Sequence, residues 1–517
     1  MNIFFIEKFD YNIVFPVALA VISAVIVLVL TLNTEAALLV LLLGVAAVVI
    51  QKSYSRGWLL LLGVFILFPS LRISDNVFLL SDLLLFTLGF LGLLNLALTK
   101  ISFPKNNLSY YFFLLGLLGM TMVLFGYVIG QQINKTIWYF TLNLIMIWLS
   151  FTVFQHYFQT FSRVRRFFWL IIACSLAHTV FGLIMFAGGW QLANGMGIIS
   201  DKLLHPIFLN EPFRVNGFMG LHLENRLRSS ALAPLLMIGI PVTYGAFLNI
   251  RRKQGGLLNI RISNEEHFNI RFWDKLKYYL EFKTLNDLWK RQWQKIKNFI
   301  KKPELWLVLG IILQSVALIL TFRYFSLIFL LIGFLVFAIL DRNQRLGIII
   351  SGIIIVIALI VPSLLGNFQL GQESVILNWF EGFSFVAKDW LWGNGWKVVG
   401  NDGNGFIDTI HNSYLYIWNN YGIWGILILL AVLAQYFYDL YVRYIKSEGE
   451  QRIWLMVIIT IFISFSLEAM TSNALFYGPA ALLFWMMYAV SINIAQARPV
   501  FGIIETKLWF EPQKGSK

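Results

Sequence analysis

The chain has 517 residues, of which 59% are hydrophobic and 13% are charged. Soluble domains carry about a quarter of charged residues, so this composition excludes an ordinary soluble domain. The net charge of +14 does not by itself indicate nucleic-acid binding, because membrane proteins concentrate Lys and Arg on their cytoplasmic side. The single cysteine, Cys174, excludes an intrachain disulfide, and we expect it to be a small buried apolar side chain.

Long apolar runs predict an all-α polytopic membrane protein, with residues 1–517 forming a single integral membrane domain. Runs such as Val14–Leu32 reach the roughly 18 residues of a membrane-spanning helix. Lipid requires the backbone to satisfy its own hydrogen bonds, so such runs form helices. The first run lacks a basic start and a cleavage site, which favours a span over a signal peptide. We predict about 14 spans, with 12 as the alternative count, at 12–32, 36–51, 57–74, 77–98, 108–130, 136–155, 167–187, 229–249, 305–322, 324–340, 346–365, 413–437, 453–470 and 475–495.

The apolar run 305–340 is predicted to be a hairpin of two spans. As one helix it would extend about 54 Å, whereas the hydrocarbon core of a bilayer is about 30 Å thick. Two helices also place Arg323 at the outer tip. An arginine in the middle of the membrane would cost about 2.5–3.5 kcal/mol.

The distribution of basic residues predicts that both termini are cytoplasmic. In that orientation 31 of the 40 Lys and Arg lie inside and 9 lie outside, as the positive-inside rule requires. Three segments between spans are then large. Residues 188–228 and 366–412 are outer loops, and residues 250–304 are a basic cytoplasmic insert. Aromatic and apolar residues recur in the insert at helical spacing, which indicates amphipathic helices on anionic headgroups; a solvated loop without a special task is the alternative.

Nine basic residues are predicted to lie outside despite this rule, and outer cations suit a phosphate-bearing substrate. Arginine is the better phosphate ligand, because its planar guanidinium can hold two oxygens at once. For each residue an ordinary contact with lipid headgroups remains the alternative. The nine are Arg72, Lys135, Lys202, Arg214, Arg226, Arg228, Arg323, Lys388 and Lys397.

The end of the second outer loop carries the candidate chemistry. The sequence His411-Asn412-Ser413-Tyr414-Leu415 enters a span, and a Gly-rich turn with aromatic residues, Asp389–Trp396, precedes it. A histidine at a membrane surface can act as a general base at neutral pH, although a single histidine at a helix start is more often structural. Among the other histidines, His222 is singled out because it lies in the arginine-rich outer loop.

Three landmarks resemble the bacterial O-antigen ligase and O-antigen polymerase superfamily. His-Asn-x-Tyr-Leu at 411–415, followed by Gly-Ile-x-Gly at 422–425 and preceded by a Gly-x-Gly-Trp turn, is the first. Phe213–Phe218 with Asn225 is similar to the family's Arg-x-x-Gly-Phe…Asn segment, and Thr321-Phe322-Arg323 to its Ser-Arg segment. The resemblance covers about residues 205–437. Departures are Trp390-Leu391-Trp392 in place of a proline, Val375 near the place of an arginine, and fourteen spans instead of twelve.

The resemblance implies transfer of a glycan from a polyprenyl (undecaprenyl) diphosphate carrier to an acceptor hydroxyl, with inversion at the anomeric carbon. It implies no cofactor, metal or nucleotide, and a site on the periplasmic face of the bacterial inner membrane. The pathway would be the synthesis of envelope polysaccharide, such as lipopolysaccharide. The acceptor would be a lipid-A core glycan for a ligase, slightly favoured here, another lipid-linked glycan for a polymerase, or a protein.

The same resemblance implies roles for individual residues. His411 is the expected base, and Arg214 and Arg323 are the expected cations on the departing diphosphate. Loop tryptophans at 379, 390, 392 and 396 are expected either to stack on sugars or to anchor the loop at the interface. Further expected substrate-binding residues are Arg226, Arg228, Asn225, His222, Asp389, Gly393, Gly395, Asn412 and Tyr414.

Two other classes stay open. A multi-span transporter or flippase for a lipid-linked or anionic substrate also fits many spans and outer cations. It would show charged or broken helices at paired positions of two halves, and Asp82 and Glu468 do not form such a pair of positions. A structural scaffold is the third class, and it leaves the His-Asn motif unexplained.

Overall fold

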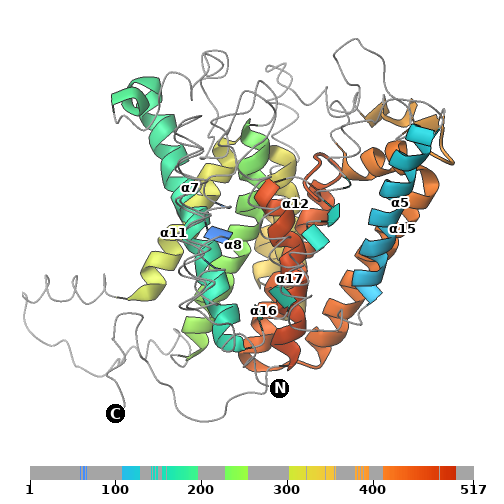
Figure 1. The fold of residues 1–517 in the computed structure, drawn as a ribbon. Coiled ribbons are helices and arrows are strands. Elements are labelled where there is room, and N and C mark those ends of the chain that lie inside the picture. Colours follow the sequence, from blue (N-terminus) through green and yellow to red (C-terminus); the bar gives the residue numbers. More distant parts are fainter. Residues whose placement is uncertain are drawn as a thin grey trace, which may run out of the picture.

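A computed structural model provides the structure of the chain. It describes residues 59, 62–63, 66, 107–128, 141, 144–145, 147–148, 154–155, 157–158, 160–195, 228–253, 302–321, 323–343, 345–353, 356, 379–380, 382–384, 386–387, 389–394, 412–476 and 478–496. The main helices are α5 (Asn107–Val128), α7 (Phe161–Gly195), α8 (Arg228–Lys253), α11 (Pro303–Leu320), α12 (Tyr324–Leu340), α15 (Ser413–Ile445), α16 (Gly449–Glu468) and α17 (Gly478–Gln496), and they pack side by side (Figure 1).

The all-α class and the presence of membrane-length helices are confirmed for this part of the chain. Six of the described helices are long and apolar enough to cross a membrane, and no described residue lies in a strand. The six segments are Leu108–Val128, Phe161–Leu183, Leu232–Arg252, Pro303–Leu320, Ser413–Ile445 and Gly449–Glu468; two shorter apolar helices are Phe325–Leu340 and Ala480–Ile494. The other predicted spans fall wholly or partly outside the described residues, so the total of fourteen stays a prediction.

The predicted hairpin at 305–340 is confirmed as two separate helices of opposite direction. Helix α11 ends at Leu320 and α12 begins at Tyr324, with Arg323 in the connection. The C-terminal end of α11 packs on the N-terminal part of α8, where Leu318 and Leu236 share a core cluster, so these two helices are antiparallel. By contrast, α12 ends beside the end of α8, where Arg252 of α8 lies 2.6 Å from Asp341, the residue after α12. Because α12 is parallel to α8 and α11 is antiparallel to it, α11 and α12 form a hairpin.

Helices α12 and α16 pack closely and antiparallel, and a glycine allows the approach. A Cβ added to Gly333 of α12 would stand 2.8 Å from the carbonyl oxygen of Thr460. Small residues at contacts between helices let two backbones come close in a membrane. The packing places the start of α12 beside the end of α16, and this juxtaposition builds the site described below.

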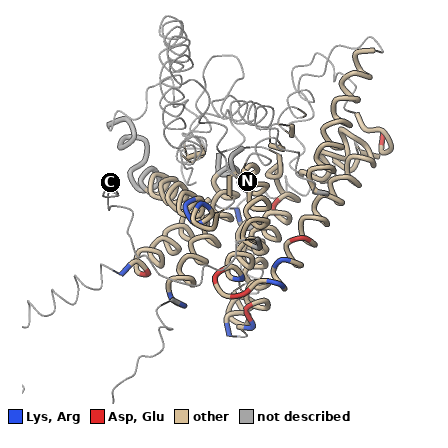
Figure 2. The backbone as a smooth tube through the Cα atoms, turned by 60° about the horizontal axis from the view of Figure 1, so that its bottom comes forward, with Lys and Arg blue, Asp and Glu red and all other residues tan. Residues whose placement is uncertain are grey.

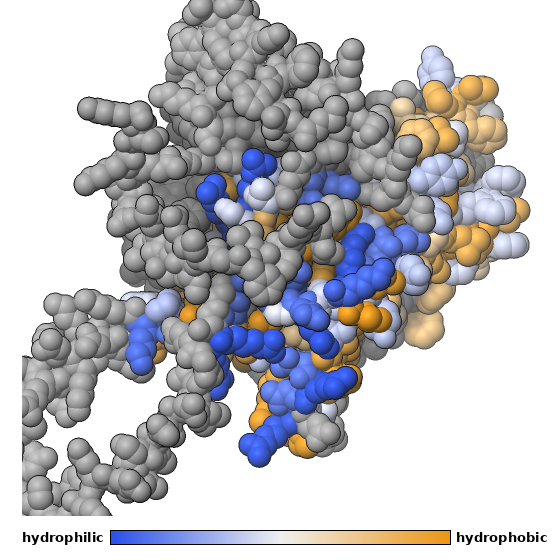
Figure 3. Space-filling view, turned by 90° about the horizontal axis from the view of Figure 1, so that it is seen from below, coloured by the Kyte–Doolittle hydropathy of each residue, from blue (hydrophilic) through white to orange (hydrophobic). Residues whose placement is uncertain are grey.

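Basic side chains collect at one end of the helices, which we call the basic end. It comprises the start of α7, the ends of α8, α12 and α15, and the start of α16. Arg165 of α7 lies 3.1 Å from Glu450 of α16, and Arg252 of α8 lies 2.6 Å from Asp341 after α12. Lys and Arg gather where these helix ends come forward (Figure 2), and strongly hydrophilic residues cluster on this face among hydrophobic ones when it is seen from below (Figure 3). We predicted these residues to be cytoplasmic.

Three predicted boundaries are corrected by the structure. Helix α7 continues to Gly195, into the predicted loop 188–228, and described residues between 379 and 387 of the predicted loop 366–412 are helical. Helix α15 continues beyond the predicted end at 437 to Ile445. It can do so because the charge of Asp439 is satisfied within the bundle, by Arg443 at 3.5 Å and by the hydroxyl of Tyr488. Residues 254–301 of the insert lie outside the described residues.

Several polar groups inside the bundle are paired between helices. The side chain of Gln314 in α11 donates to Ser175 of α7 at 2.8 Å and accepts from Thr243 of α8 at 3.2 Å. Such bonds join helices where no water is present. His178 is buried with its Nε2 2.9 Å from the carbonyl oxygen of Ile66. Cys174 is buried, as predicted. Packing within the bundle therefore accounts for the burial of these residues without a role in a functional site.

Candidate functional site

Four segments meet at the end of the bundle opposite the basic end, which we call the Arg323 end. They are the start of α12, the end of α16 with the turn after it, the start of α15, and the turn 389–394. Sequence analysis placed candidate residues in three of the four. The fourth, the end of α16, was not assigned to the site.

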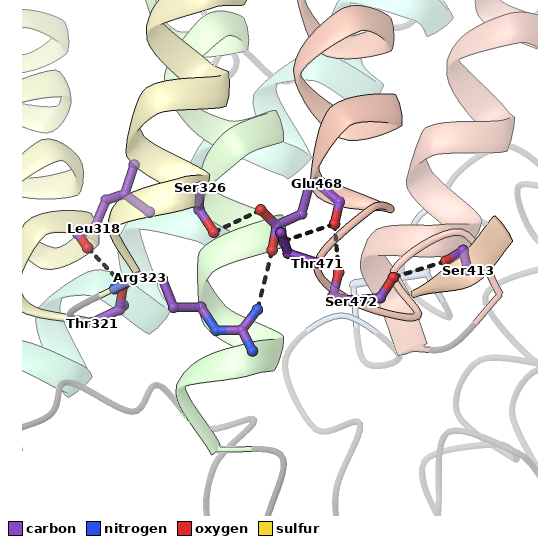
Figure 4. A network of polar contacts seen from close by, with 8 residues as sticks. All are labelled: Leu318, Thr321, Arg323, Ser326, Ser413, Glu468, Thr471 and Ser472. Carbon is purple, nitrogen blue, oxygen red and sulfur yellow. Dashed lines mark hydrogen bonds and ion pairs between the residues drawn. The ribbon is translucent and has the colours of Figure 1, made fainter. Parts of the chain in front are cut away.

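The start of α12 and the end of α16 are joined by a buried ion pair (Figure 4). Nη1 of Arg323 lies 3.1 Å from Oε1 of Glu468, and the hydroxyl of Ser326 donates to Oε2 of Glu468 at 2.8 Å. The Glu468 side chain is 0% exposed and the Arg323 side chain is 27% exposed. A buried carboxylate requires a partner charge and hydrogen bonds, and Glu468 has both.

The ion pair gives Arg323 a fixed orientation. The contact with Glu468 is made through Nη1, and the other terminal nitrogen is turned away from the carboxylate (Figure 4). A guanidinium carries five N–H donors in a planar fork, and the Arg323 side chain stays 27% exposed although Glu468 holds its Nη1. Arg323 is therefore a partly exposed cation whose inner side is held by the buried carboxylate of Glu468.

The start of α15 is tied to the turn after α16. The backbone N–H of Ser413 donates to the carbonyl oxygens of Ala469 at 2.8 Å and Ser472 at 3.2 Å. Its hydroxyl also donates to the carbonyl oxygen of Ser472, at 2.9 Å (Figure 4). The hydroxyl of Tyr414 donates to the carbonyl oxygen of Ser466 at 2.8 Å. These bonds fix the point at which the chain enters α15.

Asn412 caps α15. Its side-chain oxygen accepts from the backbone N–H groups of Tyr414 at 2.9 Å and Leu415 at 3.1 Å. Asparagine is among the best N-cap residues, because it satisfies N–H groups that have no partner within the helix. The asparagine of the His-Asn motif thus starts the helix. His411, the residue before it, lies outside the described residues, and chain connectivity keeps it two residues from Ser413.

Helix α15 is broken at Gly422, which corrects the predicted continuous span 413–437. Gly422 has φ 65° and ψ −165°, a combination that is essentially restricted to glycine. The turn 389–394 docks at the break: the N–H of Ile423 donates to the carbonyl oxygen of Trp390 at 2.9 Å, and that of Asn394 donates to Asn419 at 2.6 Å. The backbone of Leu391 occupies the space that a Cβ of residue 422 would need.

The part of α15 before the break crosses from α16 to α5. At its start Ser413 is bonded to the turn after α16, and near its end the Tyr421 hydroxyl lies 3.1 Å from the hydroxyl of Thr141. A Cβ on Gly119 of α5 would also stand 3.1 Å from that tyrosine hydroxyl. The long part of α15 after Gly422 runs along α5 (Figure 1). The segment 413–421 therefore lies across the Arg323 end.

The turn 389–394 presents aromatic side chains. Trp390 is 53% exposed and Trp392 is 61% exposed, whereas Trp379 packs against the core. The carbonyl oxygen of Asp389 accepts from the N–H of Gly393 at 2.8 Å and closes the turn. Gly393 itself has φ 75°. Within the described part of this loop, Phe380 and Phe383 are exposed as well, so this loop presents several aromatic side chains at its surface.

The remaining predicted residues divide into two groups. Arg228 begins α8, and this start lies at the Arg323 end because α8 is antiparallel to α11. The other six lie outside the described residues, so their arrangement stays a prediction: Arg214, His222, Asn225, Arg226, Gly395 and His411.

Sequence reasoning missed Glu468 as a site residue. The signal was present, since an ionisable residue within an apolar helix is expected to be paired and functional. What the sequence does not contain is the partner, which lies 145 residues away. Comparison of the chain with protein-family models, with curated proteins and with solved structures finds no match, so the function is argued from the residues and geometry of the Arg323 end.

Proposed function

We propose that the chain is a membrane glycosyltransferase that moves a glycan from a polyprenyl diphosphate carrier to an acceptor hydroxyl. The reaction would take place at the Arg323 end, facing the periplasm of a bacterial inner membrane, in an O-antigen ligase-like or polymerase-like manner. One observation carries the proposal. Arg323 is bonded to Glu468, and the turn after Glu468 holds Ser413, two residues from His411. The end of α16 thus connects two landmarks of the resemblance, the segment that ends at Arg323 and the His-Asn motif at 411–415.

The proposed step is a single displacement at the anomeric carbon. The acceptor oxygen forms a bond to C1 while the bond from C1 to the diphosphate oxygen breaks, and the electron pair leaves with the diphosphate. The acceptor proton passes to His411 as general base. Arg323, with Arg214 as the second expected cation, stabilises the negative charge that develops on the leaving group.

Glu468 supports this role as a positioning residue. Because its carboxylate holds Nη1 of Arg323 from the interior, the guanidinium needs no reorganisation when the diphosphate leaves. Preorganised charges of this kind lower a barrier more than mobile ones. The hydroxyl of Ser326 fixes the other carboxylate oxygen, which keeps Glu468 itself in place.

Trp390 and Trp392 are proposed to contact the glycan. Both are exposed beside the break in α15. Aromatic rings offer flat apolar faces that suit the apolar faces of sugar rings. Anchoring of the turn at the membrane interface is the alternative, and it predicts that replacing either tryptophan with alanine lowers the transfer of every glycan equally.

The proposal is tested with purified protein in proteoliposomes that contain a lipid-linked glycan donor. We expect release of polyprenyl diphosphate together with a product of inverted anomeric configuration. Offering a lipid-A core acceptor and a second lipid-linked glycan in separate reactions identifies the branch. A product with retained configuration would refute the single displacement.

A transporter or flippase is the second candidate, and one observation favours it. Transporters bind substrates at discontinuous helices, and α15 is broken at Gly422. This candidate predicts movement of an intact lipid-linked or anionic substrate across vesicles with no cleavage of the sugar–phosphate bond. Cleavage coupled to transfer in the same vesicles favours the transferase.

A further inference from the structure

A pocket of about 290 Å³ opens at the basic end, away from the proposed reaction site. It lies where α8 and α12 end and α16 begins. Three arginines and one aspartate supply its polar lining. The lining residues are Arg252, Leu340, Asp341, Arg342 and Arg452.

Arg452 is fixed by an aromatic partner. Its Nη2 donates to the hydroxyl of Tyr444 at 2.7 Å, and its guanidinium carbon lies 4.8 Å from the centre of the Tyr444 ring. The tyrosine hydroxyl in turn donates to the carbonyl oxygen of Leu340 at 2.8 Å. The guanidinium is therefore held beside the end of α12 by α15 and α16.

Arg252 is fixed by Asp341, with Nη2 2.6 Å from the carboxylate. The neighbouring acid on α16, Glu450, is not among the lining residues and is bonded to Arg165 and Asn249. Among the lining residues, three guanidinium groups thus face one carboxylate. The pocket carries an excess of positive charge.

Arg342 occupies a backbone position that normally belongs to glycine. It has φ 56° and is the C′ residue of a Schellman motif: its N–H donates to Ile339 at 3.1 Å, and that of Asn343 donates to Ala338 at 2.9 Å. Glycine is the usual residue at C′, since a left-handed conformation strains a residue with a Cβ. An arginine at this place sets its guanidinium at the pocket despite that strain.

We propose that this pocket binds a phosphate group, supplied by an anionic phospholipid of the membrane leaflet at the basic end. Basic pockets between helices on the cytoplasmic side suit anionic headgroups. Arginine binds phosphate oxygens in pairs. Ile339, which precedes the lining residue Leu340, is 66% exposed, and Ile445, which follows Tyr444, is 62% exposed; they offer apolar surface for acyl chains. Free phosphate could bind the same arginines as a lipid headgroup, but it has no acyl chains to contact these two isoleucines.

The test measures the thermal unfolding of the full chain, delipidated in detergent, with and without three probes. The probes are short-chain phosphatidylglycerol, short-chain phosphatidylcholine and inorganic phosphate. We expect phosphatidylglycerol to raise the unfolding temperature more than the other two. Equal stabilisation by inorganic phosphate would overturn the lipid source while supporting the phosphate site.

Two variants and one control locate the binding. Arg342→Gly removes a guanidinium and relieves the left-handed strain, so we expect equal or higher stability without lipid and an apparent affinity for phosphatidylglycerol reduced about tenfold. Arg452→Gln should weaken binding similarly. Lys446→Gln removes one charge from an exposed residue at the same end, outside the pocket, and should change affinity less than about twofold.

Two outcomes would overturn the pocket itself. The first is no preference for phosphatidylglycerol over phosphatidylcholine. The second is an equal loss of affinity in Lys446→Gln and Arg342→Gly, which would indicate diffuse attraction to the basic end. Because the readout is binding at the basic end, it is independent of the reaction proposed at the Arg323 end.

Discussion

Replacing Arg323 with alanine is expected to lower both stability and transfer. Glu468 is 0% exposed, so losing its partner leaves an uncompensated buried charge, which typically costs about 3–5 kcal/mol. Removing a cation that stabilises the leaving diphosphate should also slow transfer roughly 10²–10³-fold. Thermal inactivation in detergent and transfer in proteoliposomes measure the two effects.

A second variant separates the two roles of Arg323. Combining Arg323→Ala with Glu468→Gln removes both charges, and Gln can still accept from Ser326. The double variant is therefore expected to recover much of the stability but none of the transfer. Recovery of both would show that Arg323 serves only the ion pair. Arg165→Ala is the matched control: its pair with Glu450 is exposed at 45% on the arginine side, and such pairs contribute about 0–1 kcal/mol.

Replacing Gly393 with alanine is expected to detach the turn 389–394 from α15. Gly393 has φ 75°, and an added Cβ would stand 2.5 Å from the backbone nitrogen of Gly422 and 2.7 Å from the carbonyl carbon of Asn420. Backbone atoms cannot move aside as a flexible side chain can. The strain alone costs on the order of 1–3 kcal/mol, and relief of the clash requires the turn to shift.

Hydrogen exchange reports this change directly. The amides of Asn394 and Ile423 donate across the junction, and we expect both to lose protection in Gly393→Ala, with transfer reduced because the exposed tryptophans move. Gly449→Ala is the control, because Gly449 has φ 56° but no atom within 4 Å of an added Cβ. It should keep both amides protected. Unchanged protection in Gly393→Ala would contradict the docking of the turn.

Two features of the fold could be predicted from the hydrophobicity and charge of the sequence alone. The hairpin around Arg323 followed from a length argument, since one helix of 305–340 would be too long for a bilayer. The concentration of arginine at the basic end followed from the positive-inside rule. Both depend on local composition, which a single sequence contains.

The contacts that build the site could not be predicted in the same way. The pairing of Arg323 with Glu468 depends on the close packing of α12 on α16 at Gly333, a contact between segments far apart in the sequence. The break at Gly422 was missed because a single glycine does not by itself end a helix within a run long enough to span a membrane. Its cause is the turn 389–394, which occupies the space beside the glycine.

The contacts of the residues in the His-Asn motif could not be predicted from the local sequence either. Asn412 was expected to bind substrate, whereas the structure shows that it caps α15. The hydroxyl of Tyr414 is bonded to the backbone of α16, a contact that no local pattern indicates. Among the described residues, the sequence thus identified segments that gather at the Arg323 end better than it identified what each side chain touches.

The most direct test of glycan transfer at the Arg323 end is His411→Ala, expressed in cells without another copy of the protein and checked for membrane level. Loss of a general base should reduce transfer about 10²–10⁴-fold. We predict that ligated or polymeric envelope glycan disappears from the gel and that the lipid-linked donor accumulates. Unchanged glycan in cells that contain normal amounts of the His411→Ala protein would contradict the account.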